Sequence, residues 1–409
     1  MQDDTVTVQY PVVSPHGATA FEIVSAAGCM LVGASGREYI DLTSGWNVAN
    51  LGWAHPHILK NVLMQVSSLA LAPAWCLHEP AVRMSGMLSE LLNGDFGILR
   101  APTGTQAIEF ALRAARRLTG RYTIVSVSEC YHGSSLGSLA ASGIAYLQKE
   151  DAPLISHHRA LPLSLDPSGP EAVFNAIVAH PQPAAVLIEP FFSNPGAISP
   201  GQAYYDAIFA AAHACGALVI ADEIGTGLGR LGKLFGFQLW KHIPDMITLG
   251  KSLGGGVMPI AALALRKDLC KAVQGLAFDS TFAGTAAGCR AAVATLELLD
   301  GALLRECERK GSLALKKLQS ALGSHPAVKE VRGTGLLLGV EFAGDRQRRL
   351  KIAGAVVSEL LARGVFCAHS RYTYSLLIMP PLIIEESVLL ASLDTVIETI
   401  DSVHRRGLV

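Results

Sequence analysis

The chain has 409 residues, half of them hydrophobic, and its 33 Lys and Arg residues nearly balance 34 Asp and Glu residues, giving a formal net charge of -1. This length and apolar content suffice for a large core and about two domains, as in a globular enzyme. Because the chain has little net charge and no run of like charges, we expect no nucleic-acid or anionic-membrane partner and infer a small-molecule partner.

The N-terminal part is predicted to form a β-hairpin followed by helices. Residues 29–42 alternate in strand fashion around an Ala-Ser-Gly turn. Residues 58–71 and 79–93 have helical patterns.

From residue 97 onward, short apolar runs alternate with helix-length segments. Continuous apolar strands separated by helices are typical of a mainly parallel sheet covered on both faces. Ligands of such sheets bind at the carboxyl ends of the strands. The predicted strands are residues 97–100, 122–128, 184–189, 217–222, 245–250 and 260–266.

Beyond about residue 294 the pattern changes to two long helical stretches, a strand at 335–342, another helix, short strands and a terminal helix. We therefore expect an α/β protein in which a smaller α+β domain accompanies the large one. The expected division is an N-terminal arm that joins the smaller domain (1–53), the large ligand-binding domain (54–293) and the rest of the smaller domain (294–409).

Cysteine spacing and the N-terminal segment bear on location. The eight cysteines include no close Cys-x-x-Cys pair, which argues against a zinc site and a disulfide scaffold and favours a reducing compartment. The N-terminal segment lacks the basic and apolar regions of a signal peptide, and no apolar run approaches the roughly 20 residues of a membrane span. We expect a cytoplasmic protein without a metal ion.

Lys251 directly follows the apolar strand 245–250. Gly250-Lys251-Ser252 resembles the end of a P-loop, but Asp245 stands where that loop needs its first glycine. An amine held among apolar residues and glycines has its pKa lowered by desolvation, as a Schiff-base lysine requires. The alternative for Lys251 taken alone is a solvated surface charge.

Asp222 closes the strand 217–222. An ionised carboxylate at the rim of a buried sheet is costly unless a cation meets it, so we expect a positively charged partner. A helix-capping or salt-bridged aspartate is the alternative for this residue taken alone.

Thr103-Gly104-Thr105 opens an amphipathic helix after the strand 97–100. The free N–H groups and dipole of a helix start bind anions, although an ordinary N-cap uses the same residue types. Together the lysine, the aspartate and the helix start match a ligand with an aldehyde, a protonated ring nitrogen and a phosphate. That ligand is pyridoxal 5'-phosphate (PLP).

Four longer motifs surround these residues: the stretch from "LVIADEIGTGLGRLG" to "GKSLGGGVMPIAAL" (218–263), "STFAGTAAGCRAA" (280–292), "LGWAHPHI" and "RGTGLLLGVEF". On these motifs the chain resembles the class III (omega) PLP-dependent aminotransferases of fold type I, from about residue 20 to residue 400. The resemblance implies a seven-stranded type of sheet in the PLP-binding domain.

The resemblance also implies residue roles. It makes Lys251 the Schiff-base lysine that moves a proton between the substrate carbon and PLP. It pairs Asp222 with the protonated pyridinium nitrogen, and it places the phosphate at Gly104 and Thr105.

Further positions match residues that surround the ring. Tyr131 matches the aromatic residue stacked on one ring face, and Ile224 matches the branched aliphatic residue on the other. Thr281 matches a threonine that reaches the phosphate of the neighbouring subunit, which implies a homodimer with shared active sites. For His132, a structural bond to Asp222 is favoured over a role as catalytic acid.

Three positions depart from the family pattern and bear on the substrate. Gly225 replaces a common glutamine that contacts the phenolic oxygen of PLP. Asn194 replaces a glutamate, and Leu377 replaces an arginine that grips an α-carboxylate. Glutamate and arginine form a charge pair in members that have both, so losing both leaves no buried orphan charge.

A site with neither charge is expected to bind an α-carboxylate poorly. The expected reaction is therefore a ping-pong transfer from a primary or omega-amine to a keto acid or aldehyde. Arg371 or another mobile arginine is a candidate for the acceptor's carboxylate. Trp46 and Trp75 fall in segments that line the substrate entrance in relatives, which favours a bulky apolar or aromatic substrate, with core packing as the alternative.

Two other functions stay open at this point. Racemases or epimerases, aminomutases and decarboxylases on the same fold share Lys251 and Asp222. The segment "GLGRLG" (227–232) fits G-x-G-x-x-G, which leaves a nicotinamide-dependent oxidoreductase as a remote alternative. Against it, the acidic pair Asp222-Glu223 precedes the glycines, whereas the dinucleotide fingerprint needs an acid well after them.

Overall fold

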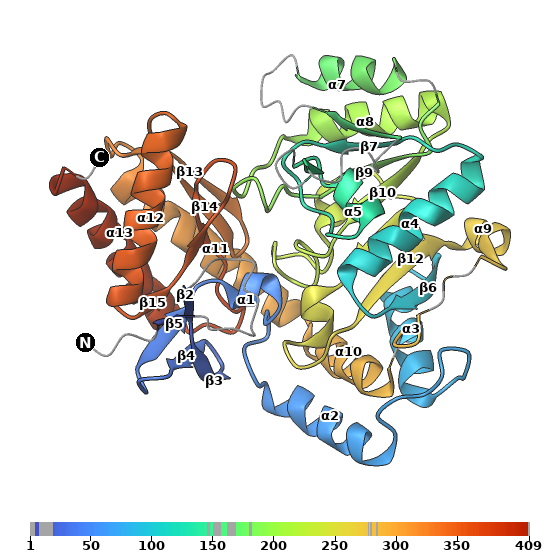
Figure 1. Ribbon diagram of the computed structural model, residues 1–409, viewed down its shortest axis with the longest axis horizontal. Coiled ribbons are helices and arrows are strands. Elements are labelled where there is room, and N and C mark those ends of the chain that lie inside the picture. Colours follow the sequence, from blue (N-terminus) through green and yellow to red (C-terminus); the bar gives the residue numbers. More distant parts are fainter. Residues whose placement is uncertain are drawn as a thin grey trace.

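The computed structural model describes two bodies joined side by side (Figure 1). A seven-stranded sheet forms the centre of the larger body, and two four-stranded sheets belong to the smaller one. Both chain ends lie on the side of the smaller body. The described residues are 5–7, 19–144, 148–149, 157–161, 169–179, 182–276, 278, 280–283 and 285–407.

The large sheet is mainly parallel, as the sequence predicts. Only β12 runs antiparallel to its neighbours. Every predicted strand of this sheet is present, and β8 is an additional strand whose polar residues hid it from the apolar pattern. In spatial order the strands are β6 (Phe96–Ala101), β12 (Ala261–Arg266), β11 (Met246–Leu249), β10 (Leu218–Asp222), β9 (Ala185–Ile188), β7 (Ile124–Val127) and β8 (His158–Leu161).

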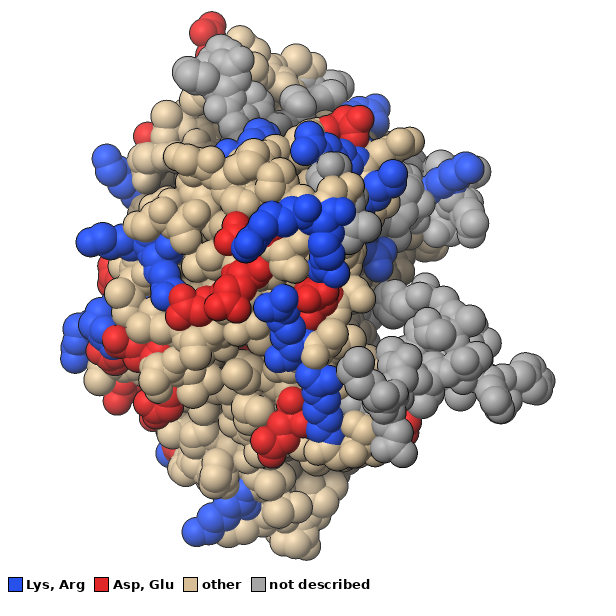
Figure 2. Space-filling view, turned by 90° about the vertical axis from the view of Figure 1, so that its left-hand side faces the viewer, with Lys and Arg blue, Asp and Glu red and all other residues tan. Residues whose placement is uncertain are grey.

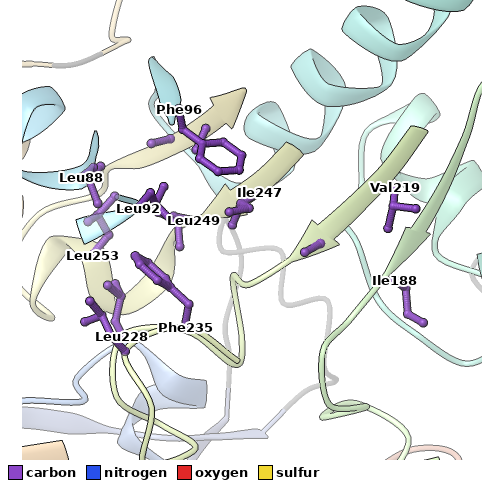
Figure 3. Packing of buried hydrophobic residues seen from close by; sticks show 14 of the residues in the cluster. Leu88, Leu92, Phe96, Ile188, Val219, Leu228, Phe235, Ile247, Leu249 and Leu253 are labelled. Carbon is purple, nitrogen blue, oxygen red and sulfur yellow. The ribbon is translucent and has the colours of Figure 1, made fainter. Parts of the chain in front are cut away.

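Helices cover both faces of this sheet, so successive residues of its central strands enter opposite cores. On β9, for example, Val186 and Ile188 pack in one core while Ala185 and Leu187 pack in the other. Figure 3 shows the first core, in which Ile247 and Leu249 of β11 lie near Leu253 and Phe235. The double burial explains why the strands are continuous apolar runs.

The helices divide between these two cores. Residues of α4 (Gly104–Thr119) pack in one core, and residues of α3 (Glu79–Leu91), α8 (Gln202–Cys215) and α10 (Ala286–Leu298) pack in the other. Three further helices of the larger body are α2 (Pro56–Ser68), α5 (Leu136–Ala141) and α7 (Gly169–Val178).

The smaller body combines the two ends of the chain. The predicted N-terminal hairpin is β4 (Met30–Gly33) and β5 (Glu38–Asp41), and β15 (Val365–Phe366) pairs with β5 in parallel. The N-terminal segment therefore belongs to the α+β body, as the sequence predicts. Its other elements are β3 (Ile23–Ala27), β13 (Val328–Thr334), β14 (Leu337–Phe342), β16 (Ala368–His369), β17 (Leu376–Ile378), α11 (Gly301–Leu322), α12 (Arg346–Ala362) and α13 (Glu386–Arg405).

The outer face of the smaller body carries interleaved charges. Figure 2 shows Lys and Arg side chains beside Asp and Glu side chains over much of this face. Ion pairs join the helices of this body, such as Arg309 of α11 with Glu386 of α13 and Lys317 of α11 with Asp394 of α13. Among the described helices, none combines the length and the apolar character that a membrane crossing requires.

The glycine motif at residues 227–232 forms a turn. The completely buried side chain of Arg230 connects this turn to other segments by hydrogen bonds. The next helical element is the short 3-10 helix η1 (Gly236–Leu239), whereas a dinucleotide pyrophosphate needs the start of an α-helix. The motif therefore lacks the structural context of a nicotinamide site. The Arg230 guanidinium donates to Leu336 O, Pro380 O, Ser44 Oγ and Asn50 Oδ1, at 2.8, 2.7, 3.1 and 2.6 Å.

Candidate active site

A cavity of about 170 Å³ lies at the carboxyl ends of β9 and β10. Parallel strands bring their carboxyl ends to one edge, so residues far apart in sequence meet there. Nine of the predicted site residues line this cavity: Trp46, Gly104, Thr105, Tyr131, Asn194, Asp222, Ile224, Gly225 and Lys251.

Three predicted residues lie outside the cavity wall. Leu377 is buried in a small apolar cluster with Phe191, against which Trp46 packs from the cavity side. Trp75 is 87% exposed in the loop between α2 and α3, and Thr281 is exposed on the loop before α10.

Asp222 ends β10 and is held from several directions. Its Oδ2 accepts a hydrogen bond from His132 Nδ1 at 2.6 Å, and both side chains are buried. Its Oδ1 accepts from the Ile224 amide at 3.0 Å and from Thr248 Oγ1 at 3.2 Å. The bond expected between His132 and Asp222 is thus present, and it fixes the carboxylate at the cavity wall.

Lys251 reaches the same edge through the strand register. Asp222 pairs with Thr248 on the neighbouring strand β11, and Lys251 follows three residues later. Its backbone is left-handed, with φ of 45°, a conformation that non-glycine residues adopt at a cost and that concentrates at functional sites.

The electrostatics of Lys251 favour a neutral amine. Burial lowers the pKa of the Lys251 amine, although the nearby carboxylates of Asp222 and Glu189 oppose this shift. A lowered pKa increases the fraction of neutral amine near pH 7, which is the form that attacks a carbonyl carbon. The position suits Schiff-base chemistry.

The start of α4 forms an open cradle beside the lysine. Thr103 Oγ1 accepts a hydrogen bond from the Gln106 amide at 3.2 Å, which leaves the amides of Gly104 and Thr105 ahead of this cap at the helix start. A Cβ atom on Gly104 would lie 2.9 Å from Ile224 Cδ1, so a side chain there would push the Ile224 side chain aside, whereas glycine leaves it in place. Such a start binds phosphate readily.

Glu189 and Ser193 also line the cavity, although neither was predicted as a site residue. Glu189 is 4% exposed, and its Oε2 accepts hydrogen bonds from both the amide and the hydroxyl of Ser193. Burial raises the pKa of the Glu189 carboxyl. Because Glu189 follows an apolar strand as Asp222 does, the same sequence signal could have identified it.

The short segment α1 (Ser44–Asn47) delivers Trp46 to the cavity. All four of its residues are left-handed, with φ of 49°, 58°, 65° and 66°. Asn47 Nδ2 donates to Gly225 O at 3.1 Å, which connects this segment to the loop after β10. Apart from Gly45, no residue of this segment predicts the conformation, because non-glycine residues rarely adopt it.

The donor set fits PLP and offers no metal site. A buried carboxylate, an amine of lowered pKa and an open helix start suit the ring nitrogen, the aldehyde and the phosphate of PLP respectively. Within the described residues, no group of three or more His, Cys, Asp and Glu side chains is arranged to hold a metal ion.

The fold and this site define a PLP-dependent enzyme of fold type I. The family model "Aminotransferase class-III" matches residues 13–400, and the chain belongs to this family. It is therefore a PLP-dependent enzyme that transfers amino groups.

Similar proteins cover most of the chain. It is 32% identical to "Ornithine aminotransferase 1" of Staphylococcus aureus over 86% of this chain and 87% of that protein. It is 29% identical to "(R)-1-hydroxy-2-aminoethylphosphonate ammonia-lyase" of Vibrio splendidus over 90% and 83%. An ornithine aminotransferase structure from Toxoplasma gondii, described with partial occupancy of PLP at its active site, matches with a TM-score of 0.86, 26% identity and coverage of 94% and 91%.

Proposed function

We propose that the chain moves an amino group from a primary or omega-amine to a keto acid or aldehyde by a ping-pong mechanism. The observation that carries this proposal is the charge of the cavity wall. Lys251 is its one Lys or Arg side chain among the described residues. This wall therefore offers no guanidinium to bind an α-carboxylate. The best donor is an amine whose amino-bearing carbon carries no carboxylate.

Each cofactor-side residue has a role that its contacts support. Bound PLP supplies an electron sink for the carbon that bears the amino group. Lys251 Nζ takes the proton from that carbon and returns it. Asp222 keeps the ring nitrogen protonated, and His132 Nδ1 holds the carboxylate in place.

Four residues would surround the rest of the cofactor. The Gly104 and Thr105 amides bind the phosphate at the start of α4. Tyr131, from the loop after β7, and Ile224, from the loop after β10, flank the ring, and both line the cavity.

The substrate side of the cavity is neutral. Asn194 uses its amide to donate to Glu129 O at 2.9 Å, so it adds a fixed dipole rather than a charge. Leu377 supports Trp46 from behind within the apolar cluster. Trp46 therefore favours a bulky apolar or aromatic donor.

A second copy of the chain is proposed to cover the exposed apolar face around α2. Leu63, Met64 and Leu77 are 61%, 54% and 82% exposed there, and Trp75 is the most exposed of this group. Contiguous apolar surface on a folded chain marks an interaction site. In this homodimer, Thr281 would reach the phosphate site of the other subunit. The composition supports a cytoplasmic location.

The named relatives frame the substrate test. The S. aureus relative is named for ornithine, which supports an omega-amine donor. The ammonia-lyase relative favours one specific alternative, in which the same residues eliminate ammonia instead of passing it to an acceptor.

The test is a panel of amine donors added to PLP-loaded protein while the yellow absorption band is followed. Bleaching that pyruvate or 2-oxoglutarate reverses is the expected result. Turnover with an unchanged band supports a racemase, aminomutase or decarboxylase, and ammonia release without a keto acid supports a lyase. Lys251→Ala is the control, in which borohydride should no longer fix the cofactor to the chain.

A further inference from the structure

Ser193 occupies the space that a side chain at position 225 would need. A Cβ atom built on Gly225 would lie 3.1 Å from Ser193 Oγ and 3.6 Å from Lys251 Nζ. The first distance is shorter than an ordinary contact, whereas the second is ordinary. The serine hydroxyl therefore lies in the immediate surroundings of the lysine, on the side where Gly225 exposes only backbone.

The limited room beside Ser193, and not the backbone conformation, accounts for glycine at position 225. It is absent from the glycines that have a left-handed φ, so other residues could adopt its backbone. The loop also cannot easily move away, since Asn47 Nδ2 holds Gly225 O at 3.1 Å. Gly225 and Ser193 are thus coupled, because a side chain at position 225 would require Ser193 to shift by a few tenths of an ångström.

Glu189 holds Ser193 in this position. Its Oε2 accepts from the Ser193 amide at 3.0 Å and from the Ser193 hydroxyl. Because a buried carboxyl that anchors both groups leaves the serine little rotational freedom, the hydroxyl oxygen is pre-positioned at the cavity wall.

We propose that Ser193, whose hydroxyl donates to Glu189, is a cofactor-positioning residue that presents its oxygen as a hydrogen-bond acceptor beside Lys251, where Gly225 supplies no side chain. The inference rests on the proposed function, since it requires PLP in this cavity. It assigns the polar group to the loop after β9 rather than to the loop after β10. The chain would thereby keep a hydrogen-bonding group near the lysine, in the space that a side chain at position 225 would otherwise need.

The test measures PLP binding by absorbance and fluorescence titration, together with the absorption maximum of the bound cofactor. Ser193→Ala should weaken PLP binding roughly tenfold, the loss expected for one buried hydrogen bond, and shift the absorption maximum. Ser193→Thr keeps the hydroxyl and should retain most of the affinity. Ser392→Ala, which removes another buried serine hydroxyl far from the cavity on α13, is the matched control and should change neither quantity.

An exchange of the two positions tests the coupling. Gly225→Gln alone should weaken PLP binding at least tenfold because its side chain meets Ser193. Ser193→Gly combined with Gly225→Gln should bind PLP within about threefold of the wild type, because the contact is relieved and a polar side chain is restored.

Two results would overturn the inference. One is an unchanged PLP affinity and absorption maximum in Ser193→Ala, and the other is a double variant whose loss equals the two single losses combined. Wild-type protein that binds no PLP, or binds it without attachment to Lys251, would instead overturn the proposed function. The two failures are therefore distinguishable.

Discussion

The cofactor side and the substrate side of the cavity are built in different ways. On the cofactor side, Asp222, Lys251 and the Gly104 amide stand at strand ends and at a helix start, so the regular fold positions them. On the substrate side, Trp46 comes from a left-handed segment and Asn194 from an irregular loop. In this chain, regular structure positions the main groups of the cofactor side, whereas irregular segments build the substrate side.

The sharpest test of this comparison is Asp222→Ala on the cofactor side. It removes the acceptor for His132, Ile224 and Thr248, together with the charge opposite the ring nitrogen. We expect kcat/KM to fall by about 10³-fold, since preorganised electrostatic groups are worth roughly 10² to 10³ each and buried donors also lose their acceptor.

Asp245→Asn is the matched control, because Asp245 lies at the opposite end of the same strands and holds the Val219 amide and Arg266. It should lower stability without changing the absorption of bound PLP. An Asp222 variant with near wild-type activity would mean that strand-end geometry does not define the cofactor side.

The neighbouring acid, Glu223, should act on stability rather than on the cofactor. Its carboxyl accepts from the Gly236 and Phe237 amides and from Thr226, and burial raises its pKa from 4.5 to about 7. The folded state therefore holds this proton more tightly than the unfolded state, and the stabilisation is full below about pH 4.5 and lost as the pH rises through 7.

Urea unfolding of wild type and Glu223→Gln between pH 5 and pH 8 measures this effect. The free energy of unfolding of the wild type, relative to the variant, should fall by about 3 kcal/mol over this range. A difference that stays constant with pH would contradict the assignment.

Behind the substrate side, Leu377→Ala should lower stability while leaving the donor preference unchanged. Leu377 is 1% exposed and packs in a small cluster without lining the cavity. We expect a loss of about 2 to 3 kcal/mol in urea unfolding, at the lower end for buried leucines. A new preference among amine donors at unchanged stability would place Leu377 in direct contact with the substrate.

At the protein surface, Trp75→Ala should have the smallest effect on folding. Because the Trp75 side chain is 87% exposed, its removal should change the free energy of unfolding of the monomer by less than about 0.5 kcal/mol. The homodimer proposed above should dissociate at least tenfold more readily in sedimentation or light scattering. Tyr122→Ala, another exposed aromatic variant, is the control and should leave the dimer intact.

The same division limits what the sequence can predict. Buried parallel strands are continuous apolar runs, so their ends, and hence Asp222 and Lys251, can be located from the sequence. Strand β8 escaped prediction because its His158 and Arg159 are polar. The place of Ser193 depends on a distance to Gly225 across two loops, and no local pattern encodes such a distance.

Trp75 and Trp46 show how far family motifs can predict the position of a side chain. Both were predicted at the substrate entrance, yet only Trp46 lines the cavity of this chain. The position of Trp46 depends on four consecutive left-handed residues that long-range hydrogen bonds hold in place. Trp75, in contrast, lies 87% exposed outside the cavity. Family motifs locate segments, but side-chain placement requires the tertiary contacts.

The hydrogen bonds of Arg230 bear on the order in which parts of the chain can fold. Arg230 bonds Pro380, 150 residues further along the chain, and Ser44, 186 residues before it. During synthesis, all strands of the large sheet have left the ribosome well before residue 380 emerges, so the sheet can form while this arginine still lacks its last acceptor. The segment that carries Trp46 can be held early by the bonds of Ser44 with Arg230 and of Asn47 with Gly225, and it gains its last bond, from Ser44 Oγ to Met379 O, only when residue 379 has emerged.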